Sequence, residues 1–344
     1  MNIVIIAEKS HYRDWKGKTY YDILLHYKEF SINNVTLIFS DEYMNYSIDT
    51  IKILNPSLIC FFETDILNVA NYFSYVFEIG IPVYYCGLDL FYFNNCIQCP
   101  NIKRCNGIIH FSKAENIENT YRLEFPNKII THFDARFVNS HRFKNYNMEK
   151  KYDILIYGSR GGGLCGLNNL ENHISDQKYI QKYNEVYNTI LHDKHYFYPL
   201  RIKVEQLLLK NSGKYRLKIL DNASIFNAHV ANESLSQLIN ESYMTLSCCT
   251  RTDIAMAKYF EIPASYSAIL GDIPTDYEDL FKGNIVEVNE WMSDDEILQI
   301  IDKALEDKEK LWEMTKRLGD RVHQEYNLEA GTKNMDEVFE NMFM

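Results

Sequence analysis

The stretch Asp253-Ile-Ala-Met-Ala-Lys-Tyr-Phe-Glu261-Ile-Pro-Ala264 organises the fold that the sequence predicts. Its carboxylates, Asp253 and Glu261, stand slightly more than two helical turns apart, so they would share one face of a continuous helix. The apolar segment 243–250 before it is typical of a buried strand, and Ser267-Ala-Ile-Leu-Gly271-Asp272 after it of a short strand ending in a Gly-Asp turn. A strand, a turn, an acidic helix and a second strand make the kind of α/β crevice where nucleotides bind.

Length and composition favour a soluble, two-domain protein. The 344 residues suffice for two ordinary domains, and 46% hydrophobic with 24% charged residues is a globular balance. The net charge of −11 disfavours binding to nucleic acid and to anionic membrane surfaces. The apolar run at residues 1–7 is too short for a signal peptide, and no stretch approaches the roughly 20 apolar residues of a membrane span. We therefore expect a cytoplasmic protein.

The eight cysteines are expected to be reduced thiols. Four lie within apolar, strand-like runs and are expected in the core: Cys60, Cys86, Cys248 and Cys249. The pair Cys96-Ile-Gln-Cys99, with Cys105 nearby, has metal-ligand spacing, and Cys86 or His110 could complete a zinc site. A structural site usually has two such pairs. The favoured prediction is a cluster of reduced thiols in a loop, with no bound metal.

Alternation of apolar strands with amphipathic segments predicts two α/β halves, each with a mostly parallel sheet. In the first half we expect strands at 3–7, 35–40, 57–62, 82–86 and 107–111 and helices at 22–30 and 66–79. The polar stretch after residue 133 lacks a sustained period and is predicted to be a linker. In the second half we expect strands at 152–157, 216–220, 244–249, 268–270 and 284–288 and helices at 294–318 and 334–343.

The run Gly158-Ser159-Arg160-Gly-Gly-Gly163 follows the first strand of the second half. Glycines let the backbone approach a phosphate closely, and Arg160 could hold a diphosphate with two parallel hydrogen bonds. The alternative is a flexible turn. Pro199 is suited to open a helix, which would place Arg201 in its first turn. Arg201 is either a donor-binding cation or an ordinary surface residue.

The segment 253–261 resembles a signature of retaining glycosyltransferases of the GT-B fold, in which two acidic residues follow the pattern E-x7-E. Two further features resemble the glycosyltransferases grouped with spore-maturation proteins: Asp134-Ala-Arg-Phe137 in the linker, and the strand ending Tyr157-Gly158-Ser159. The resemblance covers roughly residues 130–340. It implies Rossmann-like domains at 1–133 and 152–325, a linker at 134–151, and a final helix at 326–344 that packs back towards the first domain.

The resemblance also implies roles for individual residues. Glu261 occupies the position that contacts the donor ribose, against the alternative of a solvated helix carboxylate. Asp253 occupies the position facing the donor sugar, where Glu is more common, and could also be a helix N-cap. Asp89, just past a predicted strand, could contact the sugar or acceptor, although a helix cap is the commoner role. Three further residues complete the predicted donor site: Ser159, Gly271 and Lys258. Lys258 could instead simply pair with Asp253.

These expectations combine into a glycosyltransferase that uses a nucleotide sugar of UDP or GDP as its donor substrate, with no separate cofactor and an unidentified acceptor. The chain has no Asp-x-Asp motif, which fits metal-independent stabilisation of the leaving group. Retention of the anomeric configuration is implied by the family. The alternatives are a catalytically silent sugar-nucleotide-binding or scaffold protein and a sugar-nucleotide epimerase on the same fold.

Overall fold

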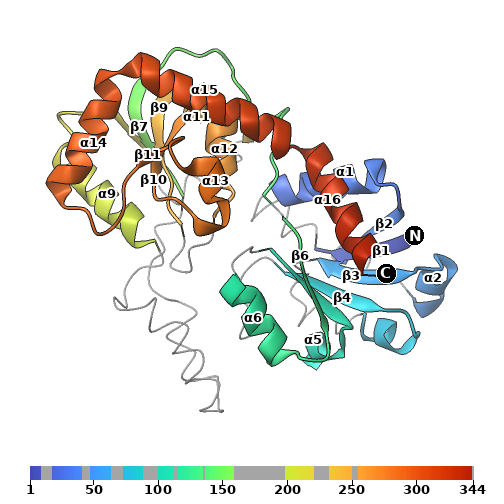
Figure 1. The fold of residues 1–344 in the computed structure, drawn as a ribbon. Helices are drawn as coiled ribbons and strands as arrows, with labels where there is room; N and C mark the ends of the chain where they lie inside the picture. Colours follow the sequence, from blue (N-terminus) through green and yellow to red (C-terminus); the bar gives the residue numbers. More distant parts are fainter. Residues whose placement is uncertain are drawn as a thin grey trace. The chain divides into compact units, whose positions relative to one another are not determined.

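A computed structural model describes residues 1–8, 18–40, 47–62, 73–87, 100–111, 115–134, 136–158, 198–220, 232–249 and 255–342. These form two compact units, each built around its own sheet (Figure 1). Unit 1 comprises residues 1–139 and 327–344, and unit 2 comprises residues 140–326. Among the described residues, no helix is both long enough and apolar enough to cross a membrane.

The described residues of unit 1 form a six-stranded parallel sheet in the order β2-β1-β3-β4-β5-β6. Its central strands read as unbroken apolar runs because both faces are covered; every residue of β3 and β4 is buried. The elements are β1 Asn2–Ala7, α1 Lys18–Phe30, β2 Asn34–Phe39, α2 Ile48–Ile53, β3 Leu58–Phe62, the 3₁₀ helix η2 Ser74–Glu78, β4 Val83–Gly87, α5 Pro100–Arg104, β5 Gly107–His110, α6 Glu115–Glu124, β6 Ile129–His132 and α16 Leu328–Asn341.

All five strands predicted for the first half are confirmed, with ends that differ by a residue. The predicted helix at 66–79 is wrong where it can be compared. Residues 74–78 form a 3₁₀ helix, since Gly80 at φ +75° and the following Pro82 stop helical continuation. The remainder of that prediction falls largely outside the described residues. Strand β6 and helix α6 were not predicted. For β6 the reason is that it is a short edge strand with one buried residue.

Helix α16 returns to unit 1 and packs against α1. Its Asp336 is 5% exposed and accepts hydrogen bonds from the Ser31 hydroxyl at 2.5 Å, the Ile32 backbone N–H at 3.2 Å and the Asn33 amide at 2.8 Å. One carboxylate therefore ties the last helix to the turn between α1 and β2.

Asp336→Ala is expected to lower the free energy of unfolding by about 2–3 kcal/mol, because three donors lose a charged acceptor inside the protein. The measurement is urea unfolding. Glu337→Ala is the matched control: its exposed carboxylate pairs with Lys333 at 3.9 Å, and its loss should cost no more than about 1 kcal/mol. Equal effects in the two variants would contradict the role assigned to Asp336.

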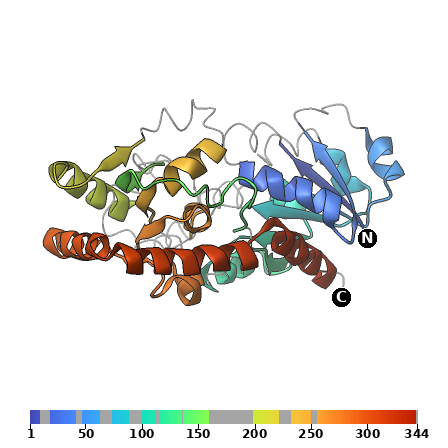
Figure 2. The same ribbon diagram turned by 90° about the horizontal axis from the view of Figure 1, so that it is seen from above.

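The described residues of unit 2 form a five-stranded parallel sheet in the order β11-β10-β9-β7-β8. Figure 2 shows α14 and α15 following one another along one side of this unit. The elements are β7 Tyr152–Ile156, α9 Pro199–Lys210, β8 Leu217–Ile219, α11 Asn232–Asn240, β9 Ser242–Leu246, α12 Lys258–Ala264, β10 Ala268–Gly271, the 3₁₀ helix η4 Thr275–Tyr277, α13 Glu278–Phe281, β11 Val286–Glu287, α14 Asp294–Glu306 and α15 Lys308–Glu325.

The five predicted strands of the second half are confirmed, but two helix predictions need correction. The helix expected at 294–318 is interrupted at Asp307, whose carboxylate caps α15 by accepting the Lys310 N–H at 3.0 Å. The continuous helix from Asp253 to Glu261 is also wrong, because α12 begins only at Lys258. Residues 255–257 precede the helix; Ala255 is 1% exposed and Met256 packs against the core.

Candidate functional site

The order of strands in unit 2 creates a topological switch point between β7 and β9. From β7 the chain goes to β8 on one side of the sheet, and it then crosses to β9 on the other side. In open parallel sheets, ligands bind outside the carboxyl ends of the strands at such a point. Gly158 lies just beyond the carboxyl end of β7, and Cys248 just beyond that of β9.

Two cations gather around the backbone of Gly158. This glycine has φ +99°, and a Cβ placed on it would lie 1.8 Å from Lys258 Nζ and 3.4 Å from Arg201 Nη1. Both cations therefore lie within 3.4 Å of one point, although α9 and α12 carry them from distant parts of the sequence. A side chain at position 158 would fill the space that they occupy.

The Lys258 ammonium is anchored to the end of β7. It donates to the Tyr157 carbonyl oxygen at 2.5 Å and lies 4.2 Å from the centre of the Tyr157 ring. Burial lowers the pKa of Lys258 well below its usual range, and the charge of Arg201 lowers it further. Cys248 and Glu261 act in the opposite direction. The site thus places two cationic side chains close together where burial disfavours the charged form of Lys258.

Arg201 is 2% exposed, so the alternative of an ordinary surface arginine is wrong. As predicted, Pro199 opens α9, which places Arg201 in the first turn of that helix. The Arg201 guanidinium lies 4.4 Å from the centre of the Tyr198 ring. A planar guanidinium held against an aromatic ring keeps its N–H groups in a fixed direction, which suits recognition of phosphate or carboxylate oxygens.

Glu261 lies in the first turn of α12 and is half-buried. Its negative charge acts on the same cluster. It partly offsets the lowering of the Lys258 pKa, and it adds to the rise that burial causes in the pKa of the Tyr157 hydroxyl. The positive charge of Arg201 partly offsets this rise in the Tyr157 pKa. Gly158, Arg201 and Lys258 therefore meet at one point, and Glu261 stands in the first turn of the helix that carries Lys258. Their donor-binding roles stay predictions. Tyr157 was not singled out, and only its place before Gly158 could have identified it.

The loop after β9 is held by Asp272, which sequence reasoning also missed. The Asp272 carboxylate accepts the Tyr259 hydroxyl at 2.5 Å and the Cys249 backbone N–H at 2.8 Å. Burial raises the pKa of Asp272 despite these bonds. The preceding Gly271 permits a close approach, since a Cβ there would lie 1.9 Å from the Ser247 carbonyl oxygen. The Gly-Asp pair after a predicted strand was the available signal.

Several predicted site residues fall outside the described residues: Asp253, Asp89, Ser159, Arg160, Cys96 and Cys99. The four cysteines expected in the core, Cys60, Cys86, Cys248 and Cys249, are buried as thiols. Cys105 is also a buried thiol, and it donates to the Asn101 carbonyl oxygen at 3.4 Å, so it is not an exposed loop thiol. Within the described ranges, no three His, Cys, Asp or Glu side chains gather to hold a metal ion.

His110, weighed above as a metal ligand, ends β5 in unit 1 and is 2% exposed. Its ring centre lies 5.5 Å from that of His132, and its Nε2 lies 3.8 Å from the Glu118 carboxylate. These side chains stand at the carboxyl ends of β5 and β6 and on α6.

Gly158→Ala is expected to lower the free energy of unfolding by about 1–3 kcal/mol, because the new Cβ meets Lys258 Nζ and the backbone must keep a positive φ. The measurement is urea unfolding. Gly213→Ala is the matched control in the same unit, since its Cβ would meet nothing within 4 Å. A Gly158→Ala variant as stable as the control would show that Lys258 moves aside without cost.

Comparison with known proteins places this geometry in a family context. Residues 204–337, which include Lys258 and Glu261, match the family model described as glycosyl transferase-like. No match was found among curated proteins.

Similar solved structures cover both units. Sucrose-phosphate synthase from Thermosynechococcus elongatus has a TM-score of 0.59 at 10% identity, covering 100% of this chain and 99% of that chain. HepE from Anabaena in complex with UDP-glucose has a TM-score of 0.57 at 10% identity, and the match covers 98% of this chain and 99% of HepE. A glycosyltransferase from Rickettsia africae ESF-5 has a TM-score of 0.54 at 12% identity, and the match covers 99% of this chain and 98% of that chain. The chain has the α/β GT-B fold with two parallel sheets, which confirms the fold prediction.

Proposed function

We propose that this protein transfers a sugar from a nucleotide-sugar donor to an acceptor. The observation that carries the proposal is the pair of cations, Lys258 and Arg201, beside Gly158 at the topological switch point of unit 2. The family match supports it, because residues 204–337 include both Lys258 and Glu261.

In this proposal, the donor diphosphate lies against Gly158, where no side chain blocks its approach. Lys258 and Arg201 hold its oxygens. When the bond to the sugar breaks, negative charge develops on the departing nucleoside diphosphate. Fixed cations in a partly buried place stabilise that charge more strongly than water does. Positive charge from the two side chains makes the proposed reaction metal-independent, and the predicted contribution of Ser159 and Arg160 would add to it.

Glu261 is proposed to accept hydrogen bonds from the two ribose hydroxyls. Its place in the first turn of α12, the turn that also holds Lys258, supports a ribose next to the diphosphate. HepE was solved with UDP-glucose and with UDP, so UDP and UDP-glucose are the first ligands to test here.

The finer parts of the proposal follow the sequence. Asp253 is proposed to face the donor sugar, a hexose, and Asp89 to contact the sugar or the acceptor. Gly271 allows close packing beside the donor. Retention of configuration is proposed, with the departing phosphate assisting deprotonation of the acceptor, so that no separate protein base is required. We also propose a division of the chain by role. Residues 1–133 form the acceptor-side domain, 134–151 the linker, 152–325 the donor-binding domain and 326–344 the closing helix.

The test is incubation of the purified protein with UDP-glucose and other UDP- and GDP-sugars, with calorimetry for binding and quantification of released nucleoside diphosphate. The expected result is binding of one donor and slow release of its nucleoside diphosphate to water. Binding without release would favour a silent binding protein. Conversion of one nucleotide sugar into another without release would favour an epimerase. Absence of binding to every nucleotide tested would overturn the proposal.

A further inference from the structure

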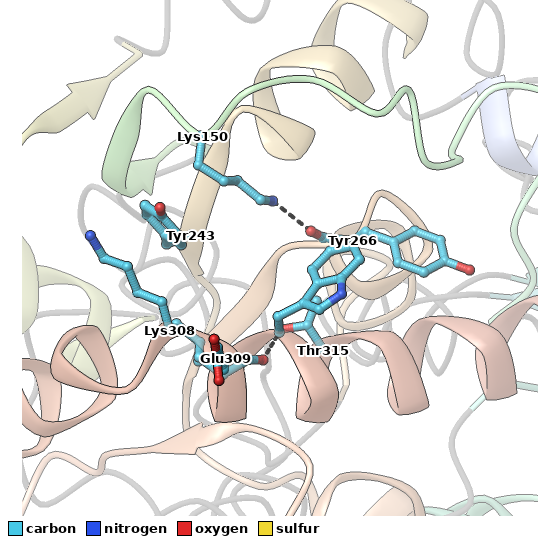
Figure 3. Close-up of a pocket in the computed structure, with 8 residues that line it drawn as sticks. Lys150, Tyr243, Tyr266, Lys308, Glu309 and Thr315 are labelled. Carbon is cyan, nitrogen blue, oxygen red and sulfur yellow. Dashed lines mark hydrogen bonds between the residues drawn. The ribbon is translucent and has the colours of Figure 1, made fainter.

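A separate cavity lies at the opposite, amino-terminal edge of the unit 2 sheet (Figure 3). Its volume is about 320 Å³, at the small end of ligand pockets and suited to one or two sugar rings. It is lined by residues next to the amino ends of β7, β9 and β10 and by the first turns of α15. The strand β7 separates it from Gly158 by roughly 20 Å, so it is distinct from the proposed donor site.

Aromatic rings form much of the cavity wall. Tyr243, Tyr266 and Trp312 all line it, and the Tyr266 and Trp312 ring centres are 5.9 Å apart. Trp312 is 40% exposed, unlike most large apolar residues of this unit. One face of a pyranose ring carries mainly C–H groups, which pack against an aromatic ring, while its hydroxyls need polar partners at the edge. The cavity offers both kinds of surface.

The polar partners inside the cavity are mainly cationic. The half-buried Lys150 donates to the Ser242 carbonyl oxygen at 2.9 Å and to the Tyr266 carbonyl oxygen at 2.7 Å. An ammonium has three N–H groups, so a third is left for a ligand. Lys150 Nζ lies 5.9 Å from the centre of the Trp312 ring, and Lys308 Nζ lies 4.7 Å from that of Tyr243.

The charge state of Lys150 makes an anion a favourable occupant. Burial lowers the pKa of Lys150 to about 8, because the charged ammonium has lost part of its hydration. An anionic group placed beside it would compensate for that loss. Two neighbouring exposed side chains of α15, Lys308 and Glu309, carry opposite charges at the edge of the cavity, so the half-buried Lys150 is the charged group inside it.

The backbone at Tyr266 gives an independent indication. Tyr266 has φ +54° and follows α12 at the position where a helix ends in the left-handed conformation. The bonds from Tyr266 N–H to the Pro263 carbonyl and from Ser267 N–H to the Ile262 carbonyl close the turn. Glycine is favoured at this position, since a bulky residue there is strained. In this protein a tyrosine occupies the position. Its ring lines the cavity, and its hydroxyl donates to Asp320 at 2.5 Å.

We propose that this cavity is a second, non-catalytic site that binds a sugar residue carrying a carboxylate. The sugar ring stacks on Trp312 between the tyrosines, and the carboxylate lies towards Lys150 and Lys308. The site would hold part of an acidic glycan on unit 2, away from the place where the donor is proposed to bind. The inference is independent of the proposed transfer reaction, because its test needs no nucleotide.

The test uses methyl β-glucuronide and methyl β-glucoside, which differ only in the carboxylate, with acetate as a bare anion. Binding to the full chain is measured by ligand-observed NMR titration. We expect the glucuronide to bind about tenfold more tightly than the glucoside and acetate, the effect of roughly one favourable charge contact. No binding of either glycoside, or equal binding of glucuronide and acetate, would overturn the proposal. Equal binding of the two glycosides would overturn the assignment of an acidic sugar.

Variants locate the site. Trp312→Ala should weaken glucuronide binding about tenfold or more, because the stacking ring is lost. Trp291→Ala is the matched control in the same unit: Trp291 is 83% exposed and lies outside the cavity, and binding should be unchanged. Lys308→Met changes an exposed side chain without disturbing the core and should reduce the preference for glucuronide over glucoside. Wild-type binding of the glucuronide in Trp312→Ala would overturn the proposal.

Discussion

Glu261→Ala is expected to weaken binding of UDP and of UDP-sugar by the same factor, about 10- to 150-fold. This corresponds to the roughly 1.5–3 kcal/mol that hydrogen bonds to a charged group contribute. The effect is shared because the ribose belongs to both ligands. Calorimetry on folded variants measures it. Glu261→Gln should lose less, since the amide keeps one oxygen acceptor in the same shape.

The matched control for Glu261→Ala is Glu278→Ala. Glu278 also stands in the first turn of a helix of unit 2, but it is exposed and pairs with Lys282. Its loss should leave UDP affinity unchanged. If Glu261→Ala binds UDP as the wild type does, the ribose assignment is wrong. If it weakens UDP-sugar but not UDP, Glu261 contacts the sugar instead.

Lys258→Met is expected to weaken UDP binding about 10- to 100-fold while changing uridine binding little, because the ammonium is proposed to contact only the diphosphate. The pH dependence supplies a second readout. Because the pKa of Lys258 is lowered, the free protein loses this positive charge at a lower pH than an ordinary lysine would. UDP binds best to the charged form, so UDP affinity should fall as the pH rises through the lowered pKa of Lys258.

Lys258→Arg is the matched control for the pH effect, since a guanidinium stays charged throughout. Its UDP affinity should not vary with pH over the range in which the wild type loses affinity. Wild type and Lys258→Arg are titrated over the same pH range, so ionisation of the terminal phosphate, which affects both proteins alike, cancels in the comparison. A wild-type affinity that is independent of pH, or equal losses for UDP and uridine in Lys258→Met, would show that Lys258 only supports the end of β7.

Local pattern was sufficient for most of the sheet. Parallel strands covered on both faces are apolar along most of their length, so a run such as that of β3 could be recognised without knowledge of its neighbours. The edge strand β6, with one buried residue, carries too little of this signal. Asp307, a charged residue within an amphipathic pattern, gave no sign that it would cap α15 rather than continue one long helix.

The sequence by itself determined the parallel α/β architecture, the glycine that follows β7 and the carboxylate in the first turn of α12. These follow from side chains and backbone conformations within a few residues of one another. Only the tertiary structure decided that Arg201 is buried and that it meets Lys258 at Gly158, and that Lys150, Tyr266 and Trp312 enclose a cavity. Such groupings depend on how helices and strand ends far apart in the chain pack together, and no local period in the sequence records that packing.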